Sequence, residues 1–151
     1  MGLKVTLDTN IFLNVKNKEE PFYKYSKTVL EAIDESDIEA IVSTVTIAEL
    51  FVGYYKANEL KDKDEFMAGL YSNKNYKIIN LDLKVADKSG EIKCKTNLKL
   101  PDCIITASSI LEQAFCLISN DAEFEKAKNL TNILTSKKFC EEYIKKTEKD
   151  N

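Results

Sequence analysis

The chain has 151 residues, of which 44% are hydrophobic and 31% are charged, a composition typical of one globular domain with a sizeable core. Its net charge of −3 and its pI of about 5.2 exclude a globally basic nucleic-acid binder but not a local positive patch. No apolar stretch is long enough to span a bilayer and no signal peptide is evident, so we expect a cytoplasmic protein without a membrane segment.

The residue types that the chain lacks narrow its chemistry further. It contains no histidine, which excludes Ser-His-Asp and Cys-His catalysis, histidine-based metal sites and the two-histidine hydrolysis of RNA. All 22 basic residues are lysines, which contact phosphate as flexible point charges. The four cysteines form no C-x-x-C pair, and we interpret them as buried or incidental thiols of a reducing compartment.

The first part of the chain alternates between predicted strands and helices. Residues 4–7 form a short apolar run with β-branched side chains, which predicts a buried strand. Residues 22–36 carry apolar side chains at helical spacing and predict an amphipathic helix. Residues 39–43 are expected to form the second strand, and residues 44–58 a long helix with Thr44 as its N-cap.

A predicted helix hairpin and a third strand occupy the middle of the chain. A helix over residues 61–72 is expected to pair with the one before it. The large apolar side chains of this hairpin are Leu50, Phe51, Tyr54, Tyr55, Phe66, Leu70 and Tyr71. Residues 76–81 predict the third strand, and residues 83–96 predict a helix. Pro101 is expected at the first position of a further helix that runs to Gln113.

The last part of the chain continues the same alternation. Residues 114–119 predict the fourth strand, and Asn120 is a candidate N-cap for a helix over residues 121–129. Residues 132–135 predict a fifth short strand, and residues 137–147 a terminal helix.

This order of elements predicts an α/β fold, with a parallel sheet of about five strands and helices on both faces. We place a single domain at residues 1–147 and a frayed tail at residues 148–151.

Four acidic residues are expected to meet at one edge of this sheet. Asp8 follows the first strand in "VTLDTNIFL", and Asp121 follows the fourth strand in "LISND". Ligands of open parallel sheets bind beyond the carboxyl ends of the strands. Glu49 lies one turn into a helix, among apolar neighbours that predict a position near a buried face. Asp102 lies in the first turn of its helix, where the helix dipole favours a negative charge.

Four ionised carboxylates in one place repel one another unless a cation neutralises them. Without histidine or a thiolate pair, the matching cation is a hard ion such as Mg²⁺ or Mn²⁺, which would support phosphodiester hydrolysis. Polar neighbours that could orient the carboxylates and bound waters are Thr9, Asn10, Ser119 and Asn120. Each of these residues, and each strand-end acid, also has a plainer interpretation as a turn former or helix cap.

Four segments of the chain resemble the PIN-domain ribonucleases, and within that family the VapC-like toxins of toxin–antitoxin pairs. The segments are "LDTNIFL", "VSTVTIAELFVG", "LKLPDCIITASS" and "CLISNDAEF". The resemblance implies a PIN-like fold and a Mg²⁺- or Mn²⁺-dependent endoribonuclease. The catalytic and metal-binding acids of the family fall on Asp8, Glu49, Asp102 and Asp121. The resemblance also implies supporting roles for Asn10 and Ser119, a homodimer, and an antitoxin that holds the enzyme inactive.

Contacts with substrate and partner are predicted on two further groups of residues. The lysines Lys93, Lys95 and Lys99 precede Asp102 and are candidates for binding RNA, although they could equally form a solvated helix face. The helix hairpin carries more large apolar side chains than it can bury, so we expect a dimer and partner interface there.

Two other functions stay open at this point. One is an RNA-processing PIN nuclease without an antitoxin, and the other is a non-catalytic module that binds RNA or a protein. An aspartyl-nucleophile phosphatase is disfavoured because Asn10 stands where a second acid is needed. A dinucleotide or P-loop site is disfavoured because the glycines form no phosphate-binding loop.

Overall fold

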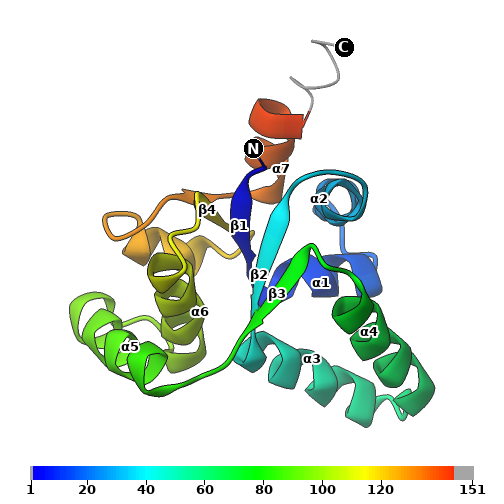
Figure 1. Ribbon diagram of the computed structural model, residues 1–151, viewed down its shortest axis with the longest axis horizontal. Helices are drawn as coiled ribbons and strands as arrows, with labels where there is room; N and C mark the ends of the chain where they lie inside the picture. The colour runs from blue at the N-terminus through cyan, green and yellow to red at the C-terminus, as the bar shows by residue number, and fades with distance from the viewer. Residues whose placement is uncertain (1, 145–151) are drawn as a thin grey trace.

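The computed structural model describes residues 2–144, which form a five-stranded parallel sheet with helices on both faces (Figure 1). The strands lie in the order β3-β2-β1-β4-β5. Their bounds are β1 Lys4–Leu7, β2 Glu39–Ser43, β3 Tyr76–Ile79, β4 Cys116–Ile118 and β5 Ile133–Leu134. The predicted α/β fold class is therefore confirmed. No helix within residues 2–144 is long and apolar enough to cross a membrane.

The helices form a layer on each face of the sheet. Their bounds are α1 Thr9–Lys16, α2 Tyr23–Glu35, α3 Thr44–Lys56, α4 Leu60–Ser72, α5 Leu83–Thr96, α6 Leu100–Leu111, the 3₁₀ helix η1 Ala122–Ala127, α7 Ser136–Phe139 and the π-helical segment η2 Cys140–Ile144. One layer contains α1, α2 and α7, which pack together, and the other contains α5, α6 and η1. Helix α3 continues from the end of β2 and pairs with α4 as the predicted hairpin.

The strand β1 occupies the centre of the sheet and sets the position of the site. It pairs with β2 on one side, with Val5 opposite Ala40, and with β4 on the other, with Val5 opposite Cys116. The chain adds β2 and β3 on one side of β1 and then crosses to add β4 and β5 on the other. Such a reversal opens a crevice beyond the carboxyl ends of the two strands that flank it, here β1 and β4.

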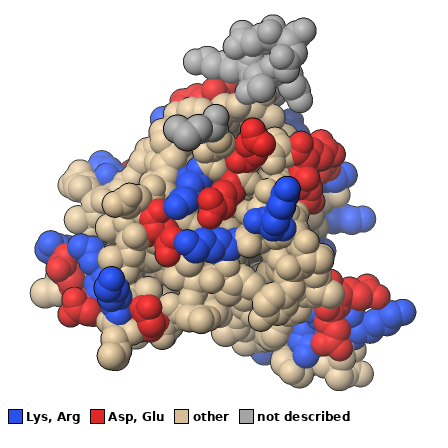
Figure 2. Space-filling view, viewed as in Figure 1, with Lys and Arg blue, Asp and Glu red and all other residues tan. Residues whose placement is uncertain are grey.

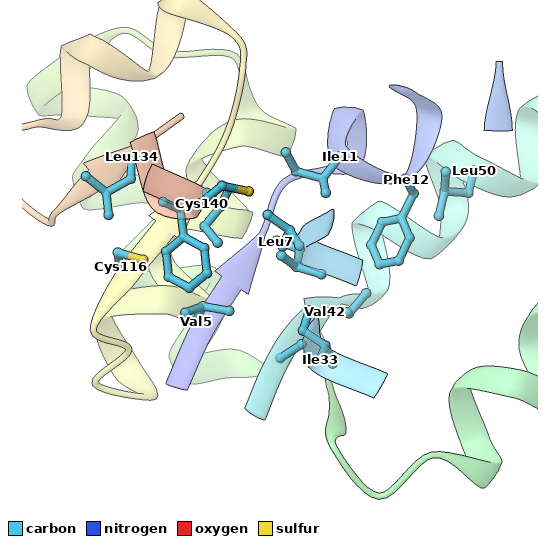
Figure 3. Close-up of a cluster of buried hydrophobic side chains, with 14 residues drawn as sticks. Val5, Leu7, Ile11, Phe12, Ile33, Val42, Leu50, Cys116, Leu134 and Cys140 are labelled. Atoms are coloured by element: carbon cyan, nitrogen blue, oxygen red, sulfur yellow. The ribbon is translucent and has the colours of Figure 1, made fainter. Parts of the chain in front are cut away.

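Alternating side chains of the strands contribute to apolar clusters on both faces of the sheet. Val5 and Leu7 of β1 lie in the cluster shown in Figure 3, which also contains Ile11 and Phe12 of α1. On the opposite face, Leu117 of β4 packs with side chains of α6 and η1. Burial on both faces explains why the strands read as nearly continuous apolar runs.

The helix α1 was not predicted from the sequence. It begins directly after β1, and the Asp8 carboxylate caps it by accepting a hydrogen bond of 2.8 Å from the Thr9 backbone N–H. Its eight residues bury Ile11 and Phe12 against the sheet. The segment is too short to show a clear helical repeat in sequence, because it makes only about two turns.

Two predicted positions at helix starts are wrong by one residue. Ser43, not Thr44, is the N-cap of α3, and its hydroxyl accepts from the Val45 N–H. Helix α6 begins at Leu100, which leaves Pro101 at the second position. Caps and first positions depend on local backbone torsions, which hydrophobic spacing does not specify.

The end of the described chain also differs from prediction. Asp121, not Asn120, caps the segment that follows β4, and this segment is a six-residue 3₁₀ helix rather than an α-helix over residues 121–129. The predicted terminal helix over residues 137–147 is seen as α7 and η2 up to residue 144. Residues 145–147 and the predicted frayed tail 148–151 lie outside the described residues.

The helix hairpin buries part of its apolar surface. Leu50, Tyr54 and Leu70 are buried, and the Phe66 ring packs edge-on against Phe12 with 5.7 Å between ring centroids. Other large side chains stay in solvent: Val52, Tyr55, Leu60 and Tyr71 are 53%, 60%, 45% and 77% exposed. The hairpin therefore completes the domain core and still presents an apolar surface.

Candidate active site

Asp8 lies at the reversal point of the sheet, where β1 and β4 end. Its carboxylate is 4% exposed and accepts hydrogen bonds from the Thr9 N–H at 2.8 Å and from the Ser119 hydroxyl at 2.7 Å. Ser119 directly follows β4, so this second bond joins the ends of the two strands that flank the crevice. The Ser119 Oγ also accepts from the Asp121 N–H at 3.0 Å. One hydroxyl thus orients one acid and positions the backbone of another.

Glu49 is held at the same edge by Thr9. The Thr9 hydroxyl donates to Glu49 Oε1 at 2.7 Å and lies 3.0 Å from the buried Thr46 hydroxyl. Thr9 has a single hydroxyl proton and the carboxylate can only accept, so Thr46 supplies the proton of the second bond. The expectation that Glu49 lies near a buried face is wrong, because the residue is exposed. The apolar contacts of this part of α3 are made by neighbours such as Leu50.

Asp102 and Asp121 complete the acidic group. Asp102 lies half-buried in the first turn of α6. Asp121 is exposed after β4, and its Oδ1 accepts from the Glu123 N–H at 2.9 Å as the cap of η1. Asp8, Asp102 and Asp121 therefore lie at or next to the starts of helical segments, whereas Glu49 lies further along α3.

The electrostatic coupling of the acids indicates that they lie together. Burial, with a smaller contribution from the negative charges of Asp102 and Glu49, raises the pKa of Asp8 to about 7, although the bonds from Ser119 and Thr9 act in the opposite direction. Burial also raises the pKa of Asp102 to about 6, with further contributions from Asp121 and Glu49. All four predicted acids thus belong to one mutually repelling group.

The donor set fits a hydrated hard cation better than a closed metal cage. Within residues 2–144, no three acidic, cysteine or histidine side chains are arranged so that they could hold a metal ion by themselves. Mg²⁺ keeps several waters and takes only one or two carboxylates from the protein, so an open carboxylate cluster suits it. Because the acids repel one another, a bound cation would offset this repulsion and stabilise the site.

The other polar residues predicted around the acids occupy different positions. Asn10 lies between the strand ends, with its Nδ2 donating to Ser119 Oγ at 3.4 Å and its Oδ1 accepting from the Asn120 N–H at 3.3 Å. The Asn120 side chain contacts none of the four acids through a bond that the structure describes. It bonds instead to Asn14 and Ser26, and to both the N–H and the hydroxyl of Ser136.

Sequence reasoning missed four polar residues of this region, namely Thr46, Asn14, Ser26 and Ser136. All four are buried. Their partners lie on elements far apart in the chain, as for Asn120 and Asn14, which are separated by 106 positions. Only the observation that a polar residue falls on an otherwise apolar helix face could have drawn attention to them.

The three candidate lysines lie in unlike environments. Lys99 is exposed, and its charge lowers the pKa of Asp102, which places it beside the acids. Lys93 donates to the Leu98 carbonyl at 2.7 Å, and Lys95 pairs with Glu91 at 3.3 Å on the surface of α5. On the face in Figure 2, lysines and acidic side chains are interspersed over α5, so this helix presents mixed charge.

Comparison with known proteins identifies the family. The sequence profile of the PIN domain matches residues 5–130, which include all four acids. The chain belongs to the PIN domain family. No curated protein matches it significantly by sequence.

Solved structures share the fold of this PIN domain at low identity. A toxin–antitoxin complex from Klebsiella pneumoniae is 24% identical, with a TM-score of 0.68 over 87% of this chain and 97% of the other. VapBC2 from Rickettsia felis, bound to a DNA fragment from its promoter, is 22% identical, with a TM-score of 0.68 over 88% and 98%. VapC20 from Mycobacterium tuberculosis, a toxin that cleaves the sarcin-ricin loop, is 10% identical, with a TM-score of 0.66 over 82% and 94%.

The raised pKa of Asp8 predicts how the stability of the metal-free protein depends on pH. Folded Asp8 holds its proton more tightly than unfolded Asp8, whose pKa is close to 3.8, so folding is favoured at low pH and this contribution is lost as pH rises to about 7. At pH 8 the ionised Asp8 lowers the free energy of unfolding by at most about 4 kcal/mol relative to low pH. The free energy of unfolding, measured by urea denaturation in EDTA between pH 5 and 8, should therefore decline.

The variant Asp8→Asn should flatten this decline and stabilise the metal-free protein at pH 8, because it removes a buried charge and keeps the polar shape. The matched control is Asp87→Asn, which changes an exposed acid of α5. Equal pH dependence in the native protein and both variants would show that ionisation of Asp8 does not destabilise the folded protein.

Proposed function

We propose that this PIN domain is a Mg²⁺- or Mn²⁺-dependent endoribonuclease and the toxin of a type II toxin–antitoxin pair, acting in the cytoplasm. The observation that carries the proposal is the group of four acids, in which the buried Asp8 is coupled to Asp102 and Glu49, and Asp102 to Asp121. Gathering carboxylates in this way is costly without a cation, and phosphodiester hydrolysis is the chemistry that such a cation serves.

The residues that would hold the cation are Asp8, Glu49, Asp102 and Asp121. When bound, Mg²⁺ or Mn²⁺ supplies positive charge that activates a water for attack at phosphorus and stabilises the leaving oxygen. The absence of histidine leaves the chain without the usual side chain for proton transfer near neutral pH. Carboxylates are the remaining acidic side chains of the site that could accept a proton there.

The hydrogen bonds of the site keep its carboxylates in place when the cation is absent. Ser119 donates to Asp8, and Thr9 donates to Glu49, so two carboxylates are oriented before anything binds. This arrangement lowers the cost of ordering the site at the moment of binding. Lys99 stands beside Asp102 and would contact a phosphate of the RNA.

The assignment as a toxin draws on the matched structures. Those from Klebsiella pneumoniae and Rickettsia felis are toxin–antitoxin complexes, and VapC20 is a toxin that cleaves an RNA loop. We extend an antitoxin partner and an RNA substrate to this chain on the strength of the shared fold and the acids.

We also propose a homodimer formed through the exposed face of the helix hairpin. Val52 and Tyr55 of α3 and Leu60 and Tyr71 of α4 are each at least 45% exposed. Apolar surface of this kind commonly marks a site of association. Tyr54 and Phe66, in contrast, pack within the domain and are unsuitable for testing the interface.

Cleavage of single-stranded RNA should depend on both the divalent cation and Asp8. The native chain should cleave a labelled RNA in Mg²⁺ or Mn²⁺ and lose this activity in EDTA. Asp8→Asn should reduce the rate by at least about a hundredfold, because it removes a ligand charge. The amide keeps one oxygen that can accept from the Thr9 N–H, whereas its Nδ2 can only donate, so the bond with Ser119 is lost or reversed. Gel analysis of the products measures the rate, with Asp87→Asn as the control. Cleavage that survives EDTA, or full activity in Asp8→Asn, would overturn the mechanism.

Lys99 should contribute to RNA affinity, and Lys95 should not. Lys99→Ala should weaken RNA binding and reduce the slope of log affinity against log salt by about 0.7, the value for one lost phosphate contact on a single strand. Lys95→Ala is the matched control, because Lys95 lies on the surface of α5 and is paired with Glu91. Fluorescence anisotropy of a labelled RNA over a range of salt gives both slopes. Identical slopes for the two variants would show that Lys99 does not contact the RNA.

The hairpin surface should control the oligomeric state. Light scattering at high micromolar concentration should give the mass of a dimer for the native chain. The double variant Val52→Lys/Tyr71→Lys should give a monomer, because it places two charges on the exposed face. The control Leu111→Lys introduces a charge at an exposed position of α6, outside the hairpin. A native monomer, or a double variant that still dimerises, would contradict the proposed interface.

A further inference from the structure

A pocket lies next to the acidic group, on the side of α2 and α7. It has a volume of about 430 Å³, within the range of small-ligand pockets. One wall comes from the segment that leads into α2, and another from the residues that follow β5. The residues that line it are Glu20, Pro21, Phe22, Lys24, Tyr25, Asn120, Thr135, Ser136 and Lys137. Helices α2 and α7 lie against each other in this layer (Figure 1).

Asn120 connects this pocket to the proposed active site. It lines the pocket, and the next residue in the chain is Asp121, whose Cα is therefore about 3.8 Å away. Its backbone N–H bonds to Asn10, which in turn bonds to Ser119 beside Asp8. A polymer bound at the acids could thus place its neighbouring unit in the pocket.

The shared wall is rigid because the hydrogen-bonding capacity of the Asn120 side chain is used within the protein. Its Nδ2 donates to Asn14 Oδ1 at 2.9 Å and to Ser26 Oγ at 3.2 Å. Its Oδ1 accepts from the Ser136 N–H and hydroxyl, both at 3.0 Å. These partners are buried residues of α1, α2 and α7. The pocket is therefore formed before a ligand binds, with its walls fixed by side chains that are already satisfied.

The lining combines aromatic rings with cations. Lys24 and Lys137 both approach the Tyr25 ring, with their Nζ atoms 4.9 and 5.9 Å from its centroid. Among the described residues, neither lysine forms an ion pair with a carboxylate. Phe22 is 37% exposed and offers a second ring. Glu20, the acid of this lining, can accept hydrogen bonds from the amino groups of a base.

We propose that this pocket binds one nucleotide of the RNA strand, next to the bond that is cut at the acids. The base lies against Phe22 and Tyr25, and its phosphate lies on Lys24 and Lys137. Aromatic rings flanked by cations are how proteins commonly bind single-stranded nucleic acid. This inference rests on the proposed endoribonuclease function, and it assigns an additional contact with the substrate to residues outside the four acids.

The test measures RNA binding separately from cleavage. Anisotropy of a labelled single-stranded RNA is recorded in EDTA, where the proposed hydrolysis cannot occur. The variant Lys24→Ala/Lys137→Ala is compared with Lys27→Ala/Lys138→Ala, which removes two lysines from the same two helices outside the pocket lining. The first variant should raise Kd by about tenfold and reduce the salt slope by about 0.7 for each lost phosphate contact, whereas the control stays within twofold of native.

A third variant tests the base contact. Phe22→Ala should raise Kd by about tenfold without changing the salt slope, because stacking on a ring involves no counterion release. Thermal unfolding should be close to native for all three variants, since the changed side chains are exposed.

The outcomes separate this inference from the proposed function. If the native chain cleaves RNA with a divalent cation, but the pocket variants bind RNA as the control does, the pocket is not a nucleotide site and the endoribonuclease stands. If the pocket variants lose binding but no cation supports cleavage, the pocket binds RNA and the catalytic assignment fails. Equal Kd values for native, pocket and control chains overturn the inference in either case.

Discussion

The arrangement of this molecule depends on keeping a nearly buried carboxylate, Asp8, at the end of the central strand. A carboxylate in this position loses hydration and faces the charges of Asp102 and Glu49, so its pKa rises to about 7. Two hydrogen bonds, from Ser119 and Thr9, offset part of that cost and fix its orientation. A protein that carried this acid for structure alone would gain stability by replacing it, because buried charges are costly unless paired.

The fold brings the supporting groups to Asp8 through its topology. Because the strand order reverses between β1 and β4, the residues after both strands lie at one crevice. Ser119 follows β4 and reaches Asp8, while α3 begins at the end of β2 and carries Glu49 to Thr9. The side chain of Asn120 forms hydrogen bonds with residues of α1, α2 and α7 instead of with the acids. These bonds fix one wall of the adjoining pocket. One short segment after β4 therefore serves both the acids and the pocket.

The sequence predicted the layout of the fold better than its details. Strands such as residues 39–43 and helices such as residues 83–96 were evident because burial on both faces of a sheet and one-sided burial of a helix leave regular apolar patterns. Helix α1 was missed because its eight residues make only about two turns, too few for a clear helical repeat in the sequence. The exposure of Glu49 was missed because apolar neighbours in sequence point to other faces of α3. Hydrogen bonds such as that of Asn120 with Asn14 join distant positions and leave no local pattern.

Cation binding by the acids can be measured directly. Free Mn²⁺ gives a strong electron paramagnetic resonance signal that is lost on binding, so titration of the native chain measures affinity without reference to RNA. The native chain should bind Mn²⁺ saturably, and Asp102→Asn should weaken this binding by at least about tenfold, because loss of one carboxylate removes a ligand charge. Asp87→Asn should bind Mn²⁺ as the native chain does. Equal Mn²⁺ binding by the native chain and Asp102→Asn, or no saturable binding at all, would contradict the proposed cation site.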